Sequence, residues 1–201
     1  MSRAGRIPIF LGVICIGTAL VITGYNLKDG LRAQNAAEAA LTELKPDIIS
    51  DSDGEDPEPL GYYPGEEMPK IRVLGEDYIG ILEIPSLGAE LPVMADWSYK
   101  NLKTAPCRYS GSLYEENLVI CAHNYPSHFG GIGSIPLGAE VRFTDGKGNI
   151  FLYEVTEVES LGPRAVEDMT NGEYELTLFT CTVEGRSRIT VRCRALTDIR
   201  D

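Results

Sequence analysis

An uncharged apolar run near the N-terminus is the strongest hydrophobic pattern in the chain. Residues 7–25 follow Arg3 and Arg6 and contain no charged side chain. About 20 such residues cross a bilayer as a helix, and flanking arginines favour the cytoplasmic side. A cleaved secretory signal has a similar pattern, but the small-residue "AEA" at residues 37–39 lies far beyond the apolar core. We therefore expect residues 1–26 to be a cytoplasmic stub and an uncleaved transmembrane anchor, with the rest of the chain outside the cell.

The next segment has the composition of a stem and a linker. Residues 27–44 are rich in alanine, leucine and glutamate, which favours a helix that rises from the membrane and ends at Pro46. Residues 47–69 are acidic and proline-containing, with no helical or strand periodicity. They predict a solvated spacer. Residues 27–70 are thus expected to be a helical stem and acidic linker.

Short apolar or alternating runs dominate the rest of the chain, so residues 71–201 predict a mostly β domain. Asp145 to Gly148 is typical of a hairpin turn. Brief helices are expected near residues 98–102 and 126–135. Seven or more closely spaced strands imply a closed or nearly closed β-barrel. The predicted strands are residues 78–84, 89–94, 117–123, 141–144, 150–161, 174–181 and 188–196.

Charge narrows the choice of partners. The 201 residues carry a formal net charge of −12, concentrated between Asp47 and Asp77. Nucleic-acid phosphates would be repelled, so nucleic acid is not an expected partner.

A cysteine and a histidine each end a predicted strand. Cys181 closes "YELTLFTC" and His123 closes "NLVICAH", so both should project at the barrel rim and could form a nucleophilic pair. Each could instead be an ordinary buried residue. Arg188 opens the strand after the Cys181 turn and would return close to the cysteine in an antiparallel pair, where an oxyanion needs a donor. Arg186 has the same strand parity as Arg188 and is the alternative candidate for the oxyanion donor. His128 is the other histidine of the chain.

Other side chains in this region have simpler interpretations. Arg192 and Arg194 are expected to be solvated edge charges. Cys193 shares the parity of Ile189 and Val191, opposite to Arg188, so a core position is expected. Cys107 could form a disulfide with another cysteine outside the cell, but spacing alone does not fix the pairing.

The segment "TLFTC", which ends at Cys181, resembles the TLxTC motif of sortases, the membrane-anchored cysteine transpeptidases of Gram-positive bacteria. Further similarity lies in "YIGILEIPSLGAELPV", "LVICAHNY" and "RITVR", in the family's order, across residues 78–196. The resemblance implies an eight-stranded sortase β-barrel. It assigns Cys181 as nucleophile, His123 as general acid and base, Arg188 as donor to the tetrahedral intermediate and Thr180 as a substrate-binding residue.

The resemblance also implies partners. Substrates would be surface proteins with a C-terminal LPXTG-like sorting signal, read by the loop at residues 162–173. The acyl group would pass to an amine of a cell-wall precursor, a pilin or another surface protein. No cofactor is implied. The histidine is preceded by Cys121-Ala122 where many sortases have Ala-Gly, and no DPW/DPF-like lid motif is present, which disfavours a pilin-polymerising class.

Two other functions remain open. Cys121, His123 and Cys181 could form a zinc site, although C-x-H plus one distant cysteine supplies only three ligands. The domain could also be a non-catalytic extracellular adaptor barrel, because a fold does not determine a function.

Overall fold

A single helix precedes the barrel. The computed structural model describes residues 3–51, 65–182 and 185–196, and its first element is α1, Arg3–Asp51. The expected anchor and stem are therefore one continuous helix of 49 residues, about 70 Å long at 1.5 Å per residue. The prediction that Pro46 ends the helix is wrong, because α1 continues to Asp51. Residues 52–64, most of the predicted spacer, lie outside the described residues.

Packing explains why the helix passes Pro46. A proline inside a helix costs about 3 kcal/mol through a lost hydrogen bond and a steric clash. Leu44 and Ile48 lie on either side of Pro46, and both are buried against the barrel. They belong to an apolar stripe with helical spacing, which is the usual source of helix stability in proteins. The stripe consists of Ala33, Ala37, Ala40, Leu44 and Ile48.

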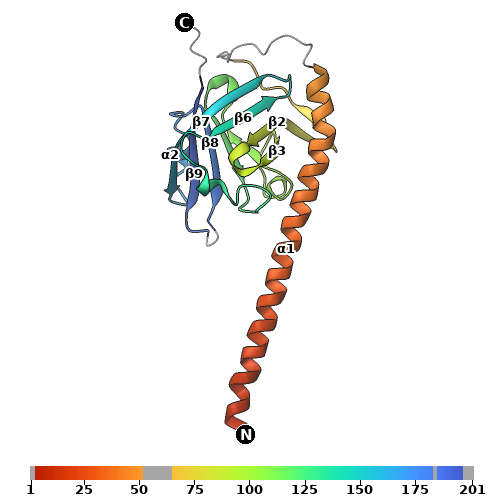
Figure 1. The fold of residues 1–201 in the computed structure, drawn as a ribbon, viewed down its shortest axis with the longest axis vertical. Coiled ribbons are helices and arrows are strands. Elements are labelled where there is room, and N and C mark those ends of the chain that lie inside the picture. The colour runs from red at the N-terminus through yellow and green to blue at the C-terminus, as the bar shows by residue number, and fades with distance from the viewer. Residues whose placement is uncertain (1–2, 52–64, 183–184, 197–201) are drawn as a thin grey trace.

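The first half of α1 extends away from the barrel (Figure 1). The region Ile9–Ile48 contains an 18-residue stretch with a mean hydropathy of 1.9, no part of which is buried in the protein. Large apolar side chains such as Phe10 and Leu20 are exposed there. By length and composition, this helix could span a membrane.

The described residues form nine strands in one sheet, ordered β1-β2-β3-β4-β5-β8-β9-β7-β6. Antiparallel pairing of β2 with β6 joins the sheet to itself, so eight strands close into a barrel and β1 is added at β2. This confirms the predicted fold class. The strands are β1 (Ile71–Val73), β2 (Glu76–Ile84), β3 (Ala89–Met94), β4 (Cys107–Ser110), β5 (Leu118–Ala122), β6 (Glu140–Asp145), β7 (Ile150–Leu161), β8 (Leu176–Cys181) and β9 (Arg188–Ala195).

All seven predicted strands are present, with ends shifted by two residues at most. β1 and β4 were not predicted, since each is short. The expected brief helices are 3₁₀ turns, η2 (Asn101–Lys103) and η4 (Ile132–Ser134). The other 3₁₀ turns are η1 (Pro85–Leu87) and η3 (Leu113–Glu115), and the short helix α2 (Val166–Thr170) lies between β7 and β8.

A close backbone approach at Gly80 closes the barrel. Gly80 has φ of +150° and pairs with Asp145 of β6. A Cβ there would lie 2.1 Å from the carbonyl oxygen of Thr144, so only glycine fits without backbone movement. The barrel interior is filled by an apolar cluster that includes Leu82, Ile120 and Leu178.

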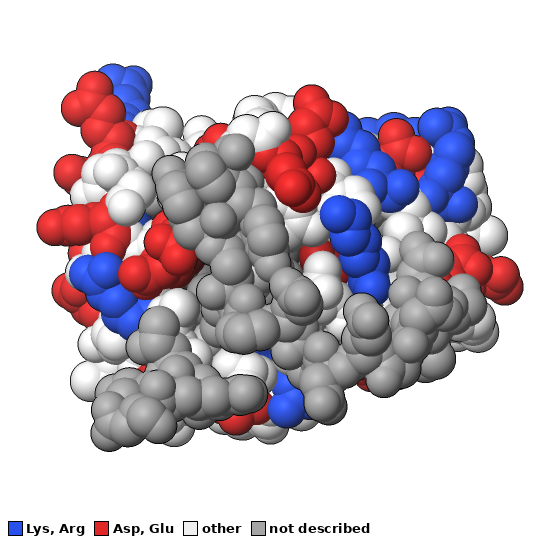
Figure 2. Space-filling view, turned by 90° about the horizontal axis from the view of Figure 1, so that it is seen from above, with Lys and Arg blue, Asp and Glu red and all other residues white. Residues whose placement is uncertain are grey.

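The barrel also has a covered outer face. A second apolar cluster joins the α1 stripe to outward-facing residues of the sheet, among them Ile81, Val119 and Phe179. Lys45 of α1 also forms an ion pair with Glu90 of β3, at 2.6 Å. Figure 2 views the molecule from above, and the described residues seen there carry interspersed acidic and basic side chains.

Docking of α1 on this face is testable through Leu44, which has no exposed surface. We expect Leu44→Ala to lower the free energy of unfolding by about 2–3 kcal/mol, because it leaves a cavity under the helix. Leu137→Ala is the control, since Leu137 is 68% exposed. The measurement is thermal unfolding of the full chain in detergent micelles. Equal, small shifts for the two variants would show that α1 does not rest on the barrel.

Candidate active site

Parallel pairing of β5 and β8 brings a histidine and a cysteine together. Ala122 pairs with Thr180, so the same register continued by one residue places His123 level with Cys181. In parallel strands the carboxyl ends meet at one edge, and neighbouring strands lie about 4.8 Å apart. Cys181 has the parity of Phe179, whose side chain lies on the outer face of the sheet. His123 has the parity of Val119, also on that face.

An arginine faces the cysteine from the other side. β8 pairs antiparallel with β9, and Cys181 is the direct partner of Arg188. Directly paired residues project to the same face of a sheet. Histidine, cysteine and arginine are therefore neighbours in a row across β5, β8 and β9. Arg186 lies exposed in the preceding turn, outside this pairing.

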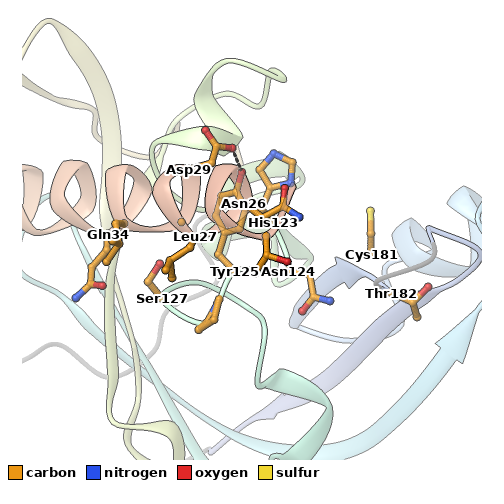
Figure 3. Close-up of a pocket in the computed structure, with 14 residues that line it drawn as sticks. Asn26, Leu27, Asp29, Gln34, His123, Asn124, Tyr125, Ser127, Cys181 and Thr182 are labelled. Atoms are coloured by element: carbon orange, nitrogen blue, oxygen red, sulfur yellow. Dashed lines mark hydrogen bonds between the residues drawn. The ribbon is translucent and has the colours of Figure 1, made fainter. Parts of the chain in front are cut away.

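A cavity opens beside this row. Its volume is about 660 Å³, and its lining includes His123, Cys181 and Thr182 of the barrel. One wall is formed by residues 23–34 of α1, among them Asn26 and Asp29. Figure 3 shows His123 and Cys181 at this opening, with Asp29 and Tyr125 beside the histidine ring. The cavity is therefore shared between the barrel and the helix that could span the membrane.

Two residues that sequence reasoning missed contact the histidine region. The rings of His123 and Tyr125 have centroids 4.9 Å apart. The Tyr125 hydroxyl donates a hydrogen bond of 2.7 Å to Asp29 Oδ2 on α1. Burial is the main cause that lowers the pKa of His123 below its ordinary value; the Asp29 carboxylate acts in the opposite direction and Lys103 adds to the lowering. His123 is thus mainly neutral at pH 7.

Comparison with known proteins identifies the family of the chain. A family model described as a sortase domain matches residues 82–196, more than half of the chain. The chain belongs to the sortase family. The match contains the His123, Cys181 and Arg188 strands, so the row of three residues lies inside the sortase domain.

The relatives include several kinds of sortase. Sortase A of Bacillus anthracis is 32% identical over 111 residues, which is 51% of each chain, so the match spans about half the length of that curated relative. The structure of a Clostridium perfringens sortase D5 transpeptidase is similar with a TM-score of 0.58 and 19% identity, over 82% of this chain and 98% of that one. The structure of sortase C1 from Streptococcus suis is similar with a TM-score of 0.53 and 23% identity, over 61% of this chain and 75% of that one. At these identities the two structures support the fold alone.

The second histidine of the sortase domain is separated from the cavity. His128 is 2% exposed, and neither ring nitrogen has a hydrogen-bond partner among the described residues. Burial is the main cause that lowers the pKa of His128, to about 4. It is therefore neutral at pH 7, and its ring packs against Tyr125.

Thr180 lies on the opposite side of the sortase sheet from Cys181. It has the parity of Leu176 and Leu178, which lie in the barrel interior, and it is 3% exposed. Its hydroxyl donates a hydrogen bond of 2.8 Å to the carbonyl oxygen of Ala122. This burial argues against the expected direct contact with substrate. The bond instead ties β8 to β5 next to the cysteine and the histidine.

Arg192 is not the solvated edge charge that was expected. It is 3% exposed, and its Nε lies 2.8 Å from Glu159 Oε1 of β7. The guanidinium also donates to the carbonyl oxygens of Asp168 and Met169 in α2 and to the Thr177 hydroxyl. Buried arginines need such partners. Arg192 therefore fastens the β7–β8 connection, the loop expected to read the sorting signal, to the sortase barrel. Arg194 is about half exposed and pairs with Glu175.

The cysteines do not support the zinc alternative. Among the described residues, no three histidine, cysteine or acidic side chains are grouped to hold a metal ion. Burial raises the pKa of the Cys121 thiol, which opposes the thiolate that zinc requires. Cys193 is fully buried in the barrel interior, as predicted. Cys107 and Cys121 are register partners on β4 and β5, and both are free thiols.

Proposed function

We propose that the chain is a sortase cysteine transpeptidase with Cys181, His123 and Arg188 as its catalytic residues. The observation that carries the proposal is the row across β5, β8 and β9, in which His123 and Cys181 line the 660 Å³ cavity and Arg188 is the strand partner of Cys181. A non-catalytic adaptor barrel would have no need of a cysteine and a histidine level with each other at a cavity. Membership of the sortase family adds independent support.

The roles follow from the chemistry of each side chain. The Cys181 sulfur attacks the peptide carbonyl of the substrate while the thiol proton passes to the neutral His123 ring. His123 then gives the proton to the leaving amine as the peptide bond breaks, which leaves an acyl-enzyme with a thioester at Cys181. An incoming amine attacks the thioester, forms a new amide bond and releases the thiol.

Arg188 suits the oxyanion that forms during each attack. Its guanidinium stays protonated, so it donates hydrogen bonds and does not act as a base. As the direct strand partner of Cys181, it faces the same side of the sheet. Thr180 is proposed to act as a positioning residue through its bond to Ala122, which keeps the two strand ends in register.

The substrate proposal comes from the family resemblance. The acyl donor is a surface protein with a C-terminal LPXTG-like sorting signal, and the acceptor is an amine of a cell-wall precursor, a pilin or another surface protein. The loop at residues 162–173, which Arg192 holds through α2, is proposed to read the signal.

The proposed location is the cell membrane, with one span and the barrel outside. The exposed apolar part of α1 and the two arginines before it support this orientation. Intact cells given a sorting-signal peptide that cannot cross the membrane should therefore convert it. Conversion only after the cells are lysed would contradict the orientation.

The proposal predicts different outcomes for the two histidines. Cys181→Ala and His123→Ala should each abolish transpeptidation of a sorting-signal peptide to a simple amine, because one removes the nucleophile and the other the proton carrier. His128→Ala should retain activity within a few fold, because His128 does not line the cavity. The assay uses the full chain in detergent micelles, with product detected by mass and folding checked by circular dichroism. Turnover near wild type in Cys181→Ala would refute the nucleophile.

The two arginines are separated by the same assay. Arg188→Lys keeps the charge but loses the planar set of donors, so we expect kcat to fall on the order of 10²- to 10³-fold with little change in KM. Arg186→Lys is the matched control and should change kcat by a few fold at most, because Arg186 is exposed in the turn. A large loss for Arg186→Lys alone would move the role to that residue, and small losses in both would remove arginine from the mechanism.

A further inference from the structure

The tyrosine beside the catalytic histidine is hydrogen-bonded to α1, which is called the stem helix below. Tyr125 lies two residues beyond His123, and its ring packs against the histidine ring with centroids 4.9 Å apart. Its hydroxyl donates a hydrogen bond of 2.7 Å to Asp29, which is 96 residues earlier in the chain. An aromatic ring fixed at both its face and its hydroxyl can restrict how the neighbouring imidazole turns.

We propose that Asp29 is a positioning residue for His123 and acts through Tyr125, so that the stem helix is part of the active site. This inference rests on the proposed function, because it assigns His123 the proton transfer. Asp29 itself carries no proton in the reaction and is not a catalytic residue.

The docking of α1 explains why Asp29 is in place. Asp29 lies one helical turn before Ala33, the first residue of the buried stripe, so it shares the face that meets the barrel. The stripe then continues to Ile48. Asp29 is thus held at the cavity by the packing that holds the whole stem. Desolvation and the Asp29 bond raise the pKa of Tyr125 to about 12, so its hydroxyl remains a donor at every working pH.

Charges around His123 come from several elements. From α1, the Asp29 carboxylate raises the pKa of His123, and from η2 the Lys103 ammonium lowers it. Tyr125 and His128 are neutral at pH 7 and add bulk rather than charge. On the barrel side the neighbours are Cys181 and, one strand further, Arg188. Asp29 is therefore the carboxylate that offsets the effect of burial on His123.

A hydrogen-bond cycle tests the positioning role. In the full chain in detergent micelles, Asp29→Ala and Tyr125→Phe should each lower kcat about 10-fold with KM within twofold, because each removes the same bond. The double variant should lose no more than either single variant. Glu43→Gln, an exposed carboxylate on the same helix, is the control and should match wild type. Additive losses, or losses that appear in KM, would assign Asp29 to substrate contact and overturn the proposal.

A titration tests the charge without using activity. The chain has two histidines, so NMR of histidine-labelled protein follows His123 directly once His128→Gln has assigned the signals. Asp29→Asn should lower the pKa of His123, and Lys103→Met should raise it. The acid limb of kcat/KM, which reports loss of the neutral ring, should move to lower and higher pH respectively. An unchanged His123 titration in Asp29→Asn would overturn the inference.

The two proposals fail in distinguishable ways. A wild-type chain that performs no transpeptidation would refute the proposed function, whatever the titrations give. An active wild type whose Asp29 and Tyr125 variants keep both its kcat and its His123 titration would refute only the role of Asp29. A lowered melting temperature of the Asp29 variants with an unchanged pH dependence of kcat/KM would show that Asp29 only stabilises the docked helix. That result would also refute the positioning role of Asp29.

Discussion

The parallel register between β5 and β8 is the constraint on which the rest of the site depends. It sets Ala122 opposite Thr180, and therefore sets His123 level with Cys181. Because side chains alternate between the faces of a strand, a slip of one residue would turn the cysteine into the barrel interior. The Thr180 hydroxyl and the Ala122 carbonyl join the two strands at this point. The antiparallel partner β9 then adds Arg188 in the same row.

The helix α1 joins this row to the exposed apolar segment that could span a membrane. One helix carries an exposed apolar segment, a wall of the cavity and a stripe buried on the barrel. Packing of its apolar stripe on the barrel allows α1 to continue beyond Pro46. The same packing places Asp29 within hydrogen-bond distance of Tyr125. One continuous helix therefore connects the apolar segment to the wall of the cavity.

Local patterns predicted the strands well because alternation and β-branched runs persist in the folded barrel. β3 and β7 have the ends that the sequence indicates, and the family resemblance assigned Cys181, His123 and Arg188 to positions that the sheet brings together. Pairing between distant strands leaves no mark in local periodicity. The sequence indicated the neighbours β6–β7 and β8–β9, which a short turn connects, but local patterns did not indicate the parallel pairing of β5 with β8.

Asp29 and Arg192 depend on such distant contacts, which local sequence patterns do not indicate. No local pattern distinguishes Asp29 from other polar residues of the stem. Its proposed role depends on the hydrogen bond from the Tyr125 hydroxyl, which only the folded structure shows. The sequence pattern predicts an edge charge at Arg192, because it does not show that α2 packs against this side chain and supplies carbonyl acceptors. Thr180 belongs to the motif, but strand alternation turns it away from the cysteine.

The most direct test of the central claim is to trap the acyl-enzyme. The full chain is incubated with a sorting-signal peptide in the absence of an amine acceptor, quenched in acid, and examined by intact mass and peptide mapping. The row across β5, β8 and β9 predicts one thioester adduct, located on Cys181, that disappears when an amine is added. An adduct on Cys107, Cys121 or Cys193, or turnover without any covalent adduct at Cys181, would contradict it.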